Sequence, residues 1–446
     1  MLNALYILNF KMPEIKAYKG NIFHFSDDAD AENCNTKYQF IENGIMVIED
    51  GLIKSIGPSN EIIKTLAKET EILDYKDSLI VPGFVDAHIH SVQTESIASY
   101  GEQLLDWLNE YIFPTERKFS DRNYAEKATK FFLRELLRNG TTTAAIFPSV
   151  HAVSTDVLFE IGHKINMRLI AGKTMMDRNS VEADFDTPET AYSESKLLIE
   201  KWHGKGRLSY AITPRFAPTS SEEQLNVASS LKKEFPGIYV QTHLAENKKE
   251  TEYVKTLFPW SKSYLEVYDH FDLLGDRSLF AHSIHLTDNE YKRIAETNSV
   301  VVHCPTSNLF LGSGLFDFKK ANEFNLRMAL GSDVGAGTSF SMFKTADEAY
   351  KVAALQSEKL SPLKLYYLLT LGGAKALSLS DKIGNFSIGK EADFNIINLN
   401  CTPLLEYRIK TAKTLEEKLF ALMILGDDRA ISETYVFGKS MNEFLQ

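Results

Sequence analysis

Residues 82–90 read Pro-Gly-Phe-Val-Asp-Ala-His-Ile-His, a short apolar run that ends in two histidines. In a β-strand, the side chains of residues i and i+2 point to the same face. His88 and His90 therefore direct their imidazoles toward one point, as two ligands of a zinc ion would at about 2.0–2.1 Å. Two core histidines would give the same pattern, so the place of this strand in the fold decides its meaning.

The region from residue 79 to residue 373 alternates short apolar runs, rich in β-forming residues, with longer amphipathic runs. Strands that alternate with helices indicate a parallel sheet. Eight such strands over about 300 residues indicate an α/β fold, a (β/α)8 TIM barrel with its site at the carboxyl ends of the strands. The expected strands are 79–88, 141–147, 168–171, 208–213, 238–243, 279–282, 300–303 and 328–333. The gaps contain helical patterns, among them 122–138, 191–202, 221–235, 287–296 and 341–356.

The two ends of the chain have a different pattern. Residues 45–53 read as a strand, a turn at Asp50-Gly51 and a second strand, and residues 389–397 and 432–436 also read as strands. We expect both ends to pair into one small β-sandwich domain beside the barrel; two independent tails are the alternative. The expected division of the chain is 1–78 and 382–446 for the sandwich and 79–381 for the catalytic barrel.

The chain contains 11 histidines, and several of them come where an expected strand ends. His243 closes the fifth strand, His282 the sixth and His303 the seventh, while Asp333 closes the eighth. Because the strand ends of a barrel meet at one rim, these side chains are expected to converge. The expected ligands of one metal ion, with a water completing the shell, are His88, His90, His243 and Asp333. Nitrogen ligands favour zinc over magnesium, and iron stays open.

Glu246 follows His243 by three residues and can reach a metal-bound water and a substrate nitrogen. A neighbouring carboxylate can manage the proton of such a water at neutral pH, although acidic residues also favour helix N-termini for their own sake. His282 and His285 compete for the role of orienting the water. His282 lies closer to the strand end and is assigned that catalytic role, with metal binding as a further assignment. His303 either contacts the site or is a buried, hydrogen-bonded histidine.

Two polar residues near the expected rim are suited to reading a planar heterocycle. Gln93 follows His90 by three residues, and Arg215 follows the fourth strand with Phe216 beside it. An amide and a guanidinium can bond to the carbonyl and ring nitrogens of a base, and we assign all three residues to substrate binding. A structural ion pair is the alternative for Arg215.

These motifs resemble the amidohydrolase superfamily and, within it, the guanine deaminase family, from about residue 19 to residue 438. The superfamily resemblance rests on residues 82–90, THLAE (242–246), AHSIHL (281–286) and GSDVGAG (331–337). The finer resemblance rests on LLDWLNEYIFPTERKF (104–119), KTMMDRN (173–179), ITPRFAPTSS (212–221), VQTHLAEN (240–247) with Glu250, and HCPTSNLFLGSGLF (303–316). His285 departs from the family, several members of which have another residue there. Residues 104–119 are our candidate for a lid or wall of the site.

The resemblance implies hydrolytic deamination of guanine to xanthine and ammonia, one zinc ion per chain and a homodimer. It implies zinc at His88, His90, His243 and Asp333 with His282 beside them, and guanine contacts from Gln93, Arg215, His243 and Glu246. In the mechanism that we expect, Asp333 accepts a proton from the water, His282 holds the nucleophile in line, and Glu246 protonates a ring nitrogen.

Three rival interpretations are weaker. Binuclear relatives carry a bridging lysine late on the fourth strand, where this chain has Pro214 and Arg215, and Lys173 is a poor substitute, so we expect a single metal. The alternative function is another aminohydrolase of the superfamily, acting on a different purine, a nucleoside or a triazine. A metal-free scaffold protein is disfavoured, because every candidate residue of the metal site is present.

The composition narrows the function further. Of the 446 residues, 44% are hydrophobic and 24% charged, which is ordinary for a globular enzyme. The net charge of −11 disfavours nucleic acid and anionic membranes as partners. Three cysteines, Cys34, Cys304 and Cys401, do not make a disulfide framework or a thiolate metal site. The apolar run 2–10 is too short to span a bilayer, so a cytoplasmic location is expected.

Overall fold

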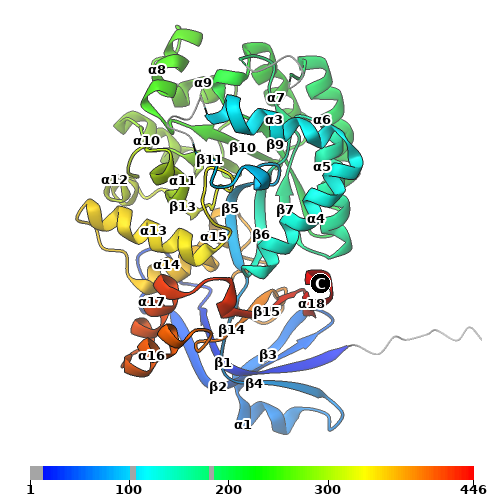
Figure 1. Cartoon of the computed structure of the whole chain (residues 1–446), viewed down its shortest axis with the longest axis vertical. Coiled ribbons are helices and arrows are strands. Elements are labelled where there is room, and N and C mark those ends of the chain that lie inside the picture. The colour runs from blue at the N-terminus through cyan, green and yellow to red at the C-terminus, as the bar shows by residue number, and fades with distance from the viewer. Residues whose placement is uncertain (1–13, 101–106, 180–184) are drawn as a thin grey trace, which may run out of the picture.

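The computed structural model describes residues 14–100, 107–179 and 185–446. Parallel strands surrounded by helices form a barrel at one end of the molecule, and a twisted sheet built from both chain ends lies at the other (Figure 1). The predicted fold class is confirmed. Of the earlier expectations, the apolar run 2–10 and positions 104–106 of the lid candidate lie outside the described residues.

Eight parallel strands form the barrel, in the spatial order β13-β12-β11-β10-β9-β7-β6-β5, with the short β8 (Thr174–Met175) added beside β9. The circle closes at the rim, where the N–H of Asp333 donates to the His88 carbonyl (2.9 Å) and that of His90 to the Val334 carbonyl (3.3 Å). The strands are β5 (Phe84–His90), β6 (Thr141–Phe147), β7 (Arg168–Ala171), β9 (Leu208–Pro214), β10 (Tyr239–Leu244), β11 (Ser278–His282), β12 (Val300–His303) and β13 (Arg327–Leu330).

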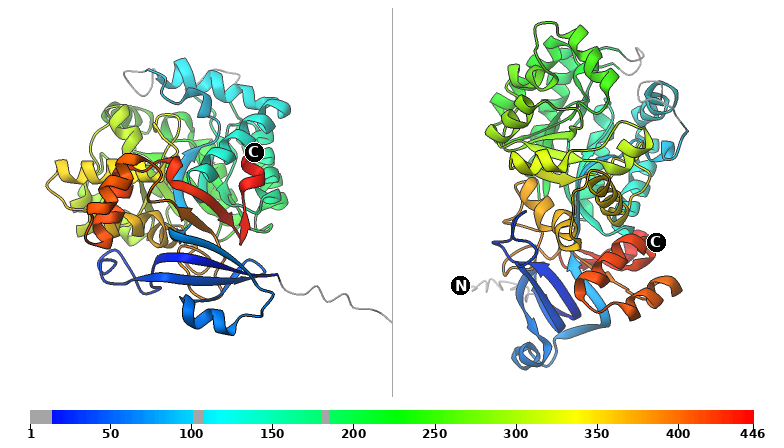
Figure 2. Two further views of the ribbon diagram at one scale, coloured as in Figure 1. Left: turned by 60° about the horizontal axis from the view of Figure 1, so that its bottom comes forward. Right: turned by 90° about the vertical axis from the view of Figure 1, so that its left-hand side faces the viewer.

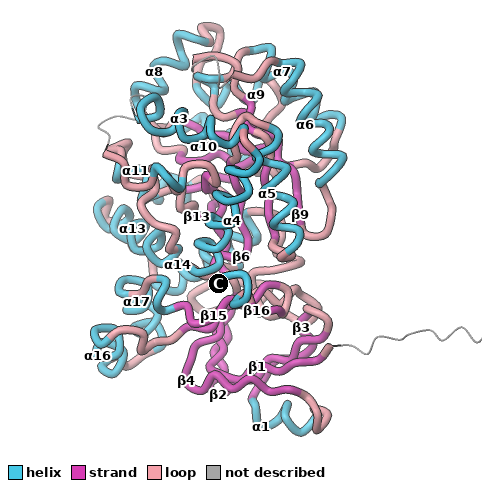
Figure 3. Tube along the Cα trace, turned by 45° about the vertical axis from the view of Figure 1, so that its right-hand side comes forward, coloured by secondary structure: helices cyan, strands magenta, loops and turns pink. Residues whose placement is uncertain are grey.

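Helices cover the outer face of the barrel (Figure 3). They are α4 (Arg122–Arg138), α5 (Ala152–Lys164), α6 (Pro188–Trp202), α7 (Glu222–Glu234), α8 (Lys248–Leu257), α9 (Tyr264–His270), α10 (Asp288–Glu296), α11 (Pro305–Phe310), α12 (Phe318–Glu323), α13 (Met342–Leu355) and α14 (Pro362–Leu369). Helix α15 (Leu371–Ala376) instead packs Ala374 and Ala376 against strand residues such as Val85 and Ala87. The capping residues explain several boundaries: the Asp121 side chain accepts the Tyr124 N–H before α4, and Thr287 and Glu290 form a capping box on α10.

The second sheet joins the two ends of the chain in the order β16-β15-β14-β4-β1-β2-β3 (Figure 2). Its strands are β1 (Ile15–Phe25), β2 (Tyr38–Glu49), β3 (Leu52–Pro58), β4 (Glu71–Pro82), β14 (Phe394–Ile397), β15 (Ile431–Val436) and β16 (Lys439–Ser440). The first four strands come from the beginning of the sequence and the last three from its end, so the predicted pairing of the two ends is confirmed. Helix α1 (Ser59–Ile62) lies beside β2 and β3 of this sheet, whereas α17 (Leu415–Leu425), with α16 (Pro403–Thr411) against it, packs on α13 and α14, and α18 (Asn442–Leu445) packs on α4.

The first expected barrel strand, 79–88, was wrong in its limits. Residues up to Pro82 belong to β4 of the end sheet, and the barrel strand β5 begins at Phe84. Gly83 is the point of division: its N–H bonds to the Asp393 carbonyl, whereas the N–H of Phe84 bonds to Gly140 (both 2.9 Å). A Cβ at Gly83 would lie 2.1 Å from the Thr142 hydroxyl oxygen, so this crossing requires glycine.

Across the described ranges, no helix combines the length and apolar character that crossing a bilayer requires.

Candidate active site

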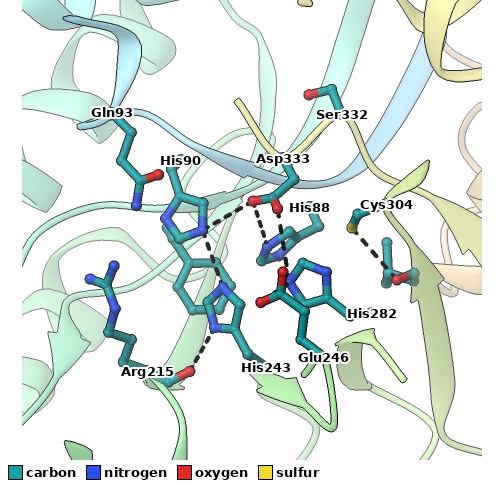
Figure 4. Close-up of polar contacts among 12 residues, drawn as sticks. His88, His90, Gln93, Arg215, His243, Glu246, His282, Cys304, Ser332 and Asp333 are labelled. Carbon is teal, nitrogen blue, oxygen red and sulfur yellow. Dashed lines mark hydrogen bonds and ion pairs between the residues drawn. The ribbon is translucent and has the colours of Figure 1, made fainter. Parts of the chain in front are cut away.

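Four histidines and one aspartate meet at the carboxyl end of the barrel (Figure 4). Single ligand atoms of His88, His243, His282 and Asp333 all lie within 4.8 Å of one another. His90 completes the group, since its Nε2 lies 3.3 Å from Asp333 Oδ1 and 3.2 Å from His243 Nε2. The convergence predicted from the sequence is therefore present in the structure.

The backbone places two of these side chains in an uncommon conformation. His282 has φ 68° and Asp333 φ 51°, both in the left-handed region that non-glycine residues seldom adopt. Asp333 was expected to close the eighth strand, but β13 ends at Leu330 and Asp333 lies three residues beyond it. The buried Asp86 carboxylate fixes this turn by accepting the Ser332 N–H (3.0 Å) and hydroxyl (2.5 Å). Strain of this kind persists where surrounding bonds over-determine the backbone, and it gathers at functional sites.

The donor set fits a zinc-like cation. Tetrahedral ligands about 2.1 Å from a metal lie about 3.4 Å from one another, and Nε2 of His88 lies 3.2 Å from Asp333 Oδ1. This Nε2 is buried without a hydrogen-bond partner. Burial lowers the pKa of His90 and, together with the other imidazoles, lowers that of His243 far more. Neutral imidazoles are the form that binds metal ions.

The carboxylate of the cluster is held in its charged form. Burial by itself raises the pKa of Asp333, but the adjacent His88, His90 and His282 outweigh it and bring the pKa well below its usual range. An ionised Asp333 beside these imidazoles is a suitable fourth ligand, and it can also accept a proton from a nearby water.

Hydrogen bonds give two of the histidines opposite roles. His243 Nδ1 donates to the Arg215 carbonyl (2.7 Å), which leaves the Nε2 lone pair free to face the cluster. His282 Nδ1 instead accepts from the Asn308 amide (2.9 Å), so the proton of its neutral ring is on Nε2. That Nε2 lies 3.5 Å from Glu246 and 3.8 Å from Asp333. The bonding favours His243 as a ligand and His282 as a donor, although distance alone admits both as ligands.

Glu246 is a buried acid beside the cluster. Burial raises its pKa well above the usual value, the charges of Asp333 and Glu250 raise it further, and a hydrogen bond from the Ser313 hydroxyl (3.2 Å) opposes them. A carboxyl group that keeps its proton near neutral pH can donate it to a substrate nitrogen.

The pocket next to the cluster has the lining of a small-molecule site, with apolar and aromatic walls and a few convergent polar groups. All three residues assigned to substrate binding, Gln93, Arg215 and Phe216, line it. The complete lining is His90, Gln93, Trp107, Leu108, Arg215, Phe216, His243, Glu246, His282, Leu311, Asp333 and Ala336.

Arg215 satisfies both interpretations offered for it, because it lines the pocket and also forms a buried ion pair. Its Nη1 lies 2.8 Å from a carboxylate oxygen of Glu116, whose other oxygen accepts from Gln93 Nε2 (2.9 Å). Glu116 belongs to α3 (Phe113–Arg117) in the described part of the lid candidate, residues 107–119. Trp107 and Leu108 of the same segment form one wall of the pocket.

Three other candidates lie away from the pocket. His285 Nε2 bonds to the Ser313 carbonyl (2.8 Å). His303 is fully buried against the rings of Phe316 and Phe318, and neither ring nitrogen has a hydrogen-bond partner. Lys173 is buried and pairs with Asp186, so it does not serve as a bridging ligand.

Sequence reasoning assigned no role to Glu116, Asn308 or Ser313. All three lie within stretches that carried the family resemblance, 104–119 and 303–316. The resemblance could therefore have pointed to these residues, but it did not say what each of them does. Each of them forms a hydrogen bond with a residue that the sequence did assign to catalysis or substrate binding: Glu116 with Gln93 and Arg215, Asn308 with His282, and Ser313 with Glu246.

Comparisons with known proteins agree with this geometry. The model of the amidohydrolase family matches residues 79–441. Guanine deaminase of Escherichia coli K12 is 49% identical over 430 residues, which cover 96% of this chain and 98% of that protein. The probable guanine deaminase of Deinococcus radiodurans is 36% identical over 405 residues, 90% of this chain and 92% of that protein.

Solved structures agree as well. The E. coli guanine deaminase structure superposes with a TM-score of 0.94 at 49% identity, covering 95% of this chain and 99% of that one. Guanine deaminase from C. acetobutylicum, solved with guanine in its active site, gives a TM-score of 0.86 at 32% identity and covers 96% and 99%. The barrel, the cluster of potential metal ligands at its rim and these similarities over nearly the full length together show that the chain belongs to the amidohydrolase family, among the guanine deaminases.

Proposed function

We propose that this protein hydrolyses guanine to xanthine and ammonia. One observation carries the proposal: one pocket brings the buried Glu246, whose pKa is raised, and a cluster of potential metal ligands together with an amide and a guanidinium suited to a planar base. The relative from C. acetobutylicum, which covers nearly the whole chain, holds guanine in its active site.

We assign one zinc ion per chain to this site. His88, His90, His243 and Asp333 would hold it, and His282 would lie beside it as a hydrogen-bond donor. When bound, zinc supplies a water that ionises near neutral pH and is therefore a competent nucleophile.

The side chains of the pocket then divide the proton transfers. Asp333, charged and next to His282, accepts the proton of the attacking water, and the Nε2–H of His282 keeps that water in line with C2 of guanine. Glu246 gives its proton to a ring nitrogen, which removes negative charge from the tetrahedral adduct. The Glu246 carboxylate then takes the remaining hydroxyl proton of the adduct and delivers it to the amine, so that ammonia leaves as the C2 carbonyl forms, and the proton held by Asp333 returns the acid to its starting state. Phe216 and Trp107 contribute apolar walls that hold the ring.

The test is an ultraviolet absorbance assay of guanine conversion with zinc-loaded protein, repeated after chelation and after zinc is restored. Loss of turnover on chelation and its return with zinc are expected. Inactivity of a zinc-replete sample would contradict the proposal for guanine, and a panel of aminated purines, pterins and triazines would then identify the substrate.

We also propose a division of the chain into an end domain, residues 1–78 and 382–446, and a barrel, residues 79–381; strand β4 of the end sheet runs on to Pro82, so the crossing itself lies at Gly83. The cysteine thiols, none of them in a disulfide, support a cytoplasmic location. The homodimer follows from the family alone, and light scattering on the purified protein tests it.

A further inference from the structure

The Glu116 carboxylate joins the two polar side chains on the substrate side of the pocket. It accepts from Gln93 Nε2 (2.9 Å) and Arg215 Nη1 (2.8 Å), and only 4% of the residue is exposed. The three residues come from different parts of the chain: Gln93 follows β5, Glu116 is on α3, and Arg215 follows β9. One buried carboxylate therefore docks the pocket wall onto both barrel segments.

The contact restricts how Gln93 can turn. Its amide nitrogen is committed to Glu116, so Oε1 is left as an acceptor. On the other side the backbone of Gly335 packs so closely that a Cβ there would lie 2.8 Å from Oε1. Exchange of the two ends of the amide would place Oε1 against the Glu116 carboxylate, so the amide keeps this orientation.

Arg215 is fixed by the same carboxylate. Its guanidinium lies over the Phe113 ring, 5.3 Å from the centroid, and Glu116 is the acid that pairs with it. Without that partner a buried positive charge would stand unpaired beside the imidazole cluster. Figure 4 shows the side chains of Gln93 and Arg215 on the same side of the imidazoles.

We propose that Glu116 is a positioning residue that locks this acceptor–donor order and so selects a purine with a 6-oxo group; the inference rests on the proposed function. Guanine presents N1–H next to the C6 carbonyl, a donor beside an acceptor, which complements the fixed pair. 2,6-Diaminopurine presents the reverse order, and a site whose buried groups are left unpaired rejects such an analogue strongly.

The experiment compares wild type with Glu116→Gln and Glu116→Ala, using ammonia release from guanine and from 2,6-diaminopurine. Glutamine keeps the shape of the side chain but has a single acceptor oxygen, so it preserves the fold while it weakens the double contact. Because the two side chains contact N1–H and the C6 carbonyl and not the amine that leaves, KM for guanine should rise about tenfold and kcat should change less than about threefold in Glu116→Gln. The ratio of kcat/KM for guanine to kcat/KM for 2,6-diaminopurine should fall by about tenfold or more.

Glu95→Gln is the matched control, because Glu95 forms an exposed ion pair with Lys118 at the same end of the barrel. It should leave KM, kcat and the preference unchanged. A Glu116→Gln enzyme with wild-type KM and preference would refute the inference, as would an equal loss for both bases, which would indicate a structural role only. Those outcomes leave guanine turnover by the wild type intact, whereas a wild type inactive on guanine refutes the proposed function and this inference together.

Discussion

Glu246 and Glu250 are buried carboxyl groups four residues apart with different surroundings. Glu246 faces the cluster and has one hydrogen bond from a hydroxyl, whereas Glu250 accepts two backbone N–H groups and the Tyr264 hydroxyl. Hydrogen bonds to the charged form favour ionisation, and burial opposes it. The residue with fewer bonds is therefore the better proton donor.

Replacing Glu246 by glutamine should abolish its proton transfer and keep its shape. We expect kcat for guanine to fall by about 10²–10⁴, with thermal unfolding unchanged because no buried charge is created. Steady-state kinetics and calorimetry measure both quantities. Glu252→Gln, on an exposed position of the next helix, is the control. A Glu246→Gln enzyme with near-normal kcat would remove Glu246 from the mechanism.

At the residue scale, the sequence identified the side chains whose signal is local. His88 and His90 alternate on one strand, and His243, His282 and Glu246 follow or close strands of a recognisable barrel. Glu116 carried no such signal, because its partner Arg215 lies 99 positions away and only the tertiary structure brings them together. Asn308 likewise acts through His282, and nothing in its own neighbourhood reveals that contact.

Among the secondary-structure elements, α8 bears most directly on the chemistry. A capping box formed by Asn247 and Glu250 starts this helix, and the same Glu250 carboxylate holds the backbone N–H of Glu246 (3.0 Å). Burial raises the pKa of Glu250 to about 7, although bonds from Tyr264 and the two backbone N–H groups lower it. The start of α8 and the position of Glu246 therefore both depend on the ionisation of Glu250.

A pH dependence follows from this shift. The folded pKa of Glu250 lies above its ordinary value of 4.5, so its contribution to stability is complete below pH 4.5 and is lost as pH rises through 7. The loss is on the order of 3 kcal/mol. Urea unfolding of wild type at pH 5, 6, 7 and 8 should show this decline, and Glu250→Gln should make the curve shallower. Parallel curves for the two proteins would contradict the assignment.

At the element scale, periodicity predicted most of the barrel. The expected runs 141–147, 168–171 and 300–303 match β6, β7 and β12, and the run 122–138 matches α4. The prediction of one barrel strand over residues 79–88 was wrong, because an apolar stretch does not reveal which of two sheets it joins. That choice depends on the bonds of Gly83 and Phe84 to distant residues, Asp393 and Gly140.

For the molecule as a whole, buried ion pairs join the barrel to the end sheet at the face opposite the active site. Arg207, just before β9, pairs with Asp393 and Glu391 just before β14, and Arg168 also pairs with Glu391. Asp393 additionally accepts the N–H of Phe437 (2.8 Å). These residues lie at the amino ends of their barrel strands, so they bear on stability and not on the reaction.

Removing Asp393 should destabilise the protein without affecting catalysis. Asp393→Ala leaves the buried Arg207 without its closest partner, and breaking a pair of this kind costs about 3–5 kcal/mol. The urea midpoint should fall accordingly, while kcat and KM for guanine in the folded enzyme stay at wild-type values. Asp381→Ala, at an exposed carboxylate beside Lys382, is the control. A change in kcat at full stability would mean that this junction is coupled to the active site.

The sheet shared by both chain ends also has a consequence for synthesis on the ribosome. Strand β4 is made early, with β1 on one side, but its other neighbour, β14, lies about 310 residues later, on the order of 15–60 s at ordinary translation rates. During that interval β4 presents an unpaired edge, the feature that invites association with other nascent chains. The edge of β4 is therefore covered only after β14 has been synthesised, late in translation, and the chance of association with other nascent chains falls at that point.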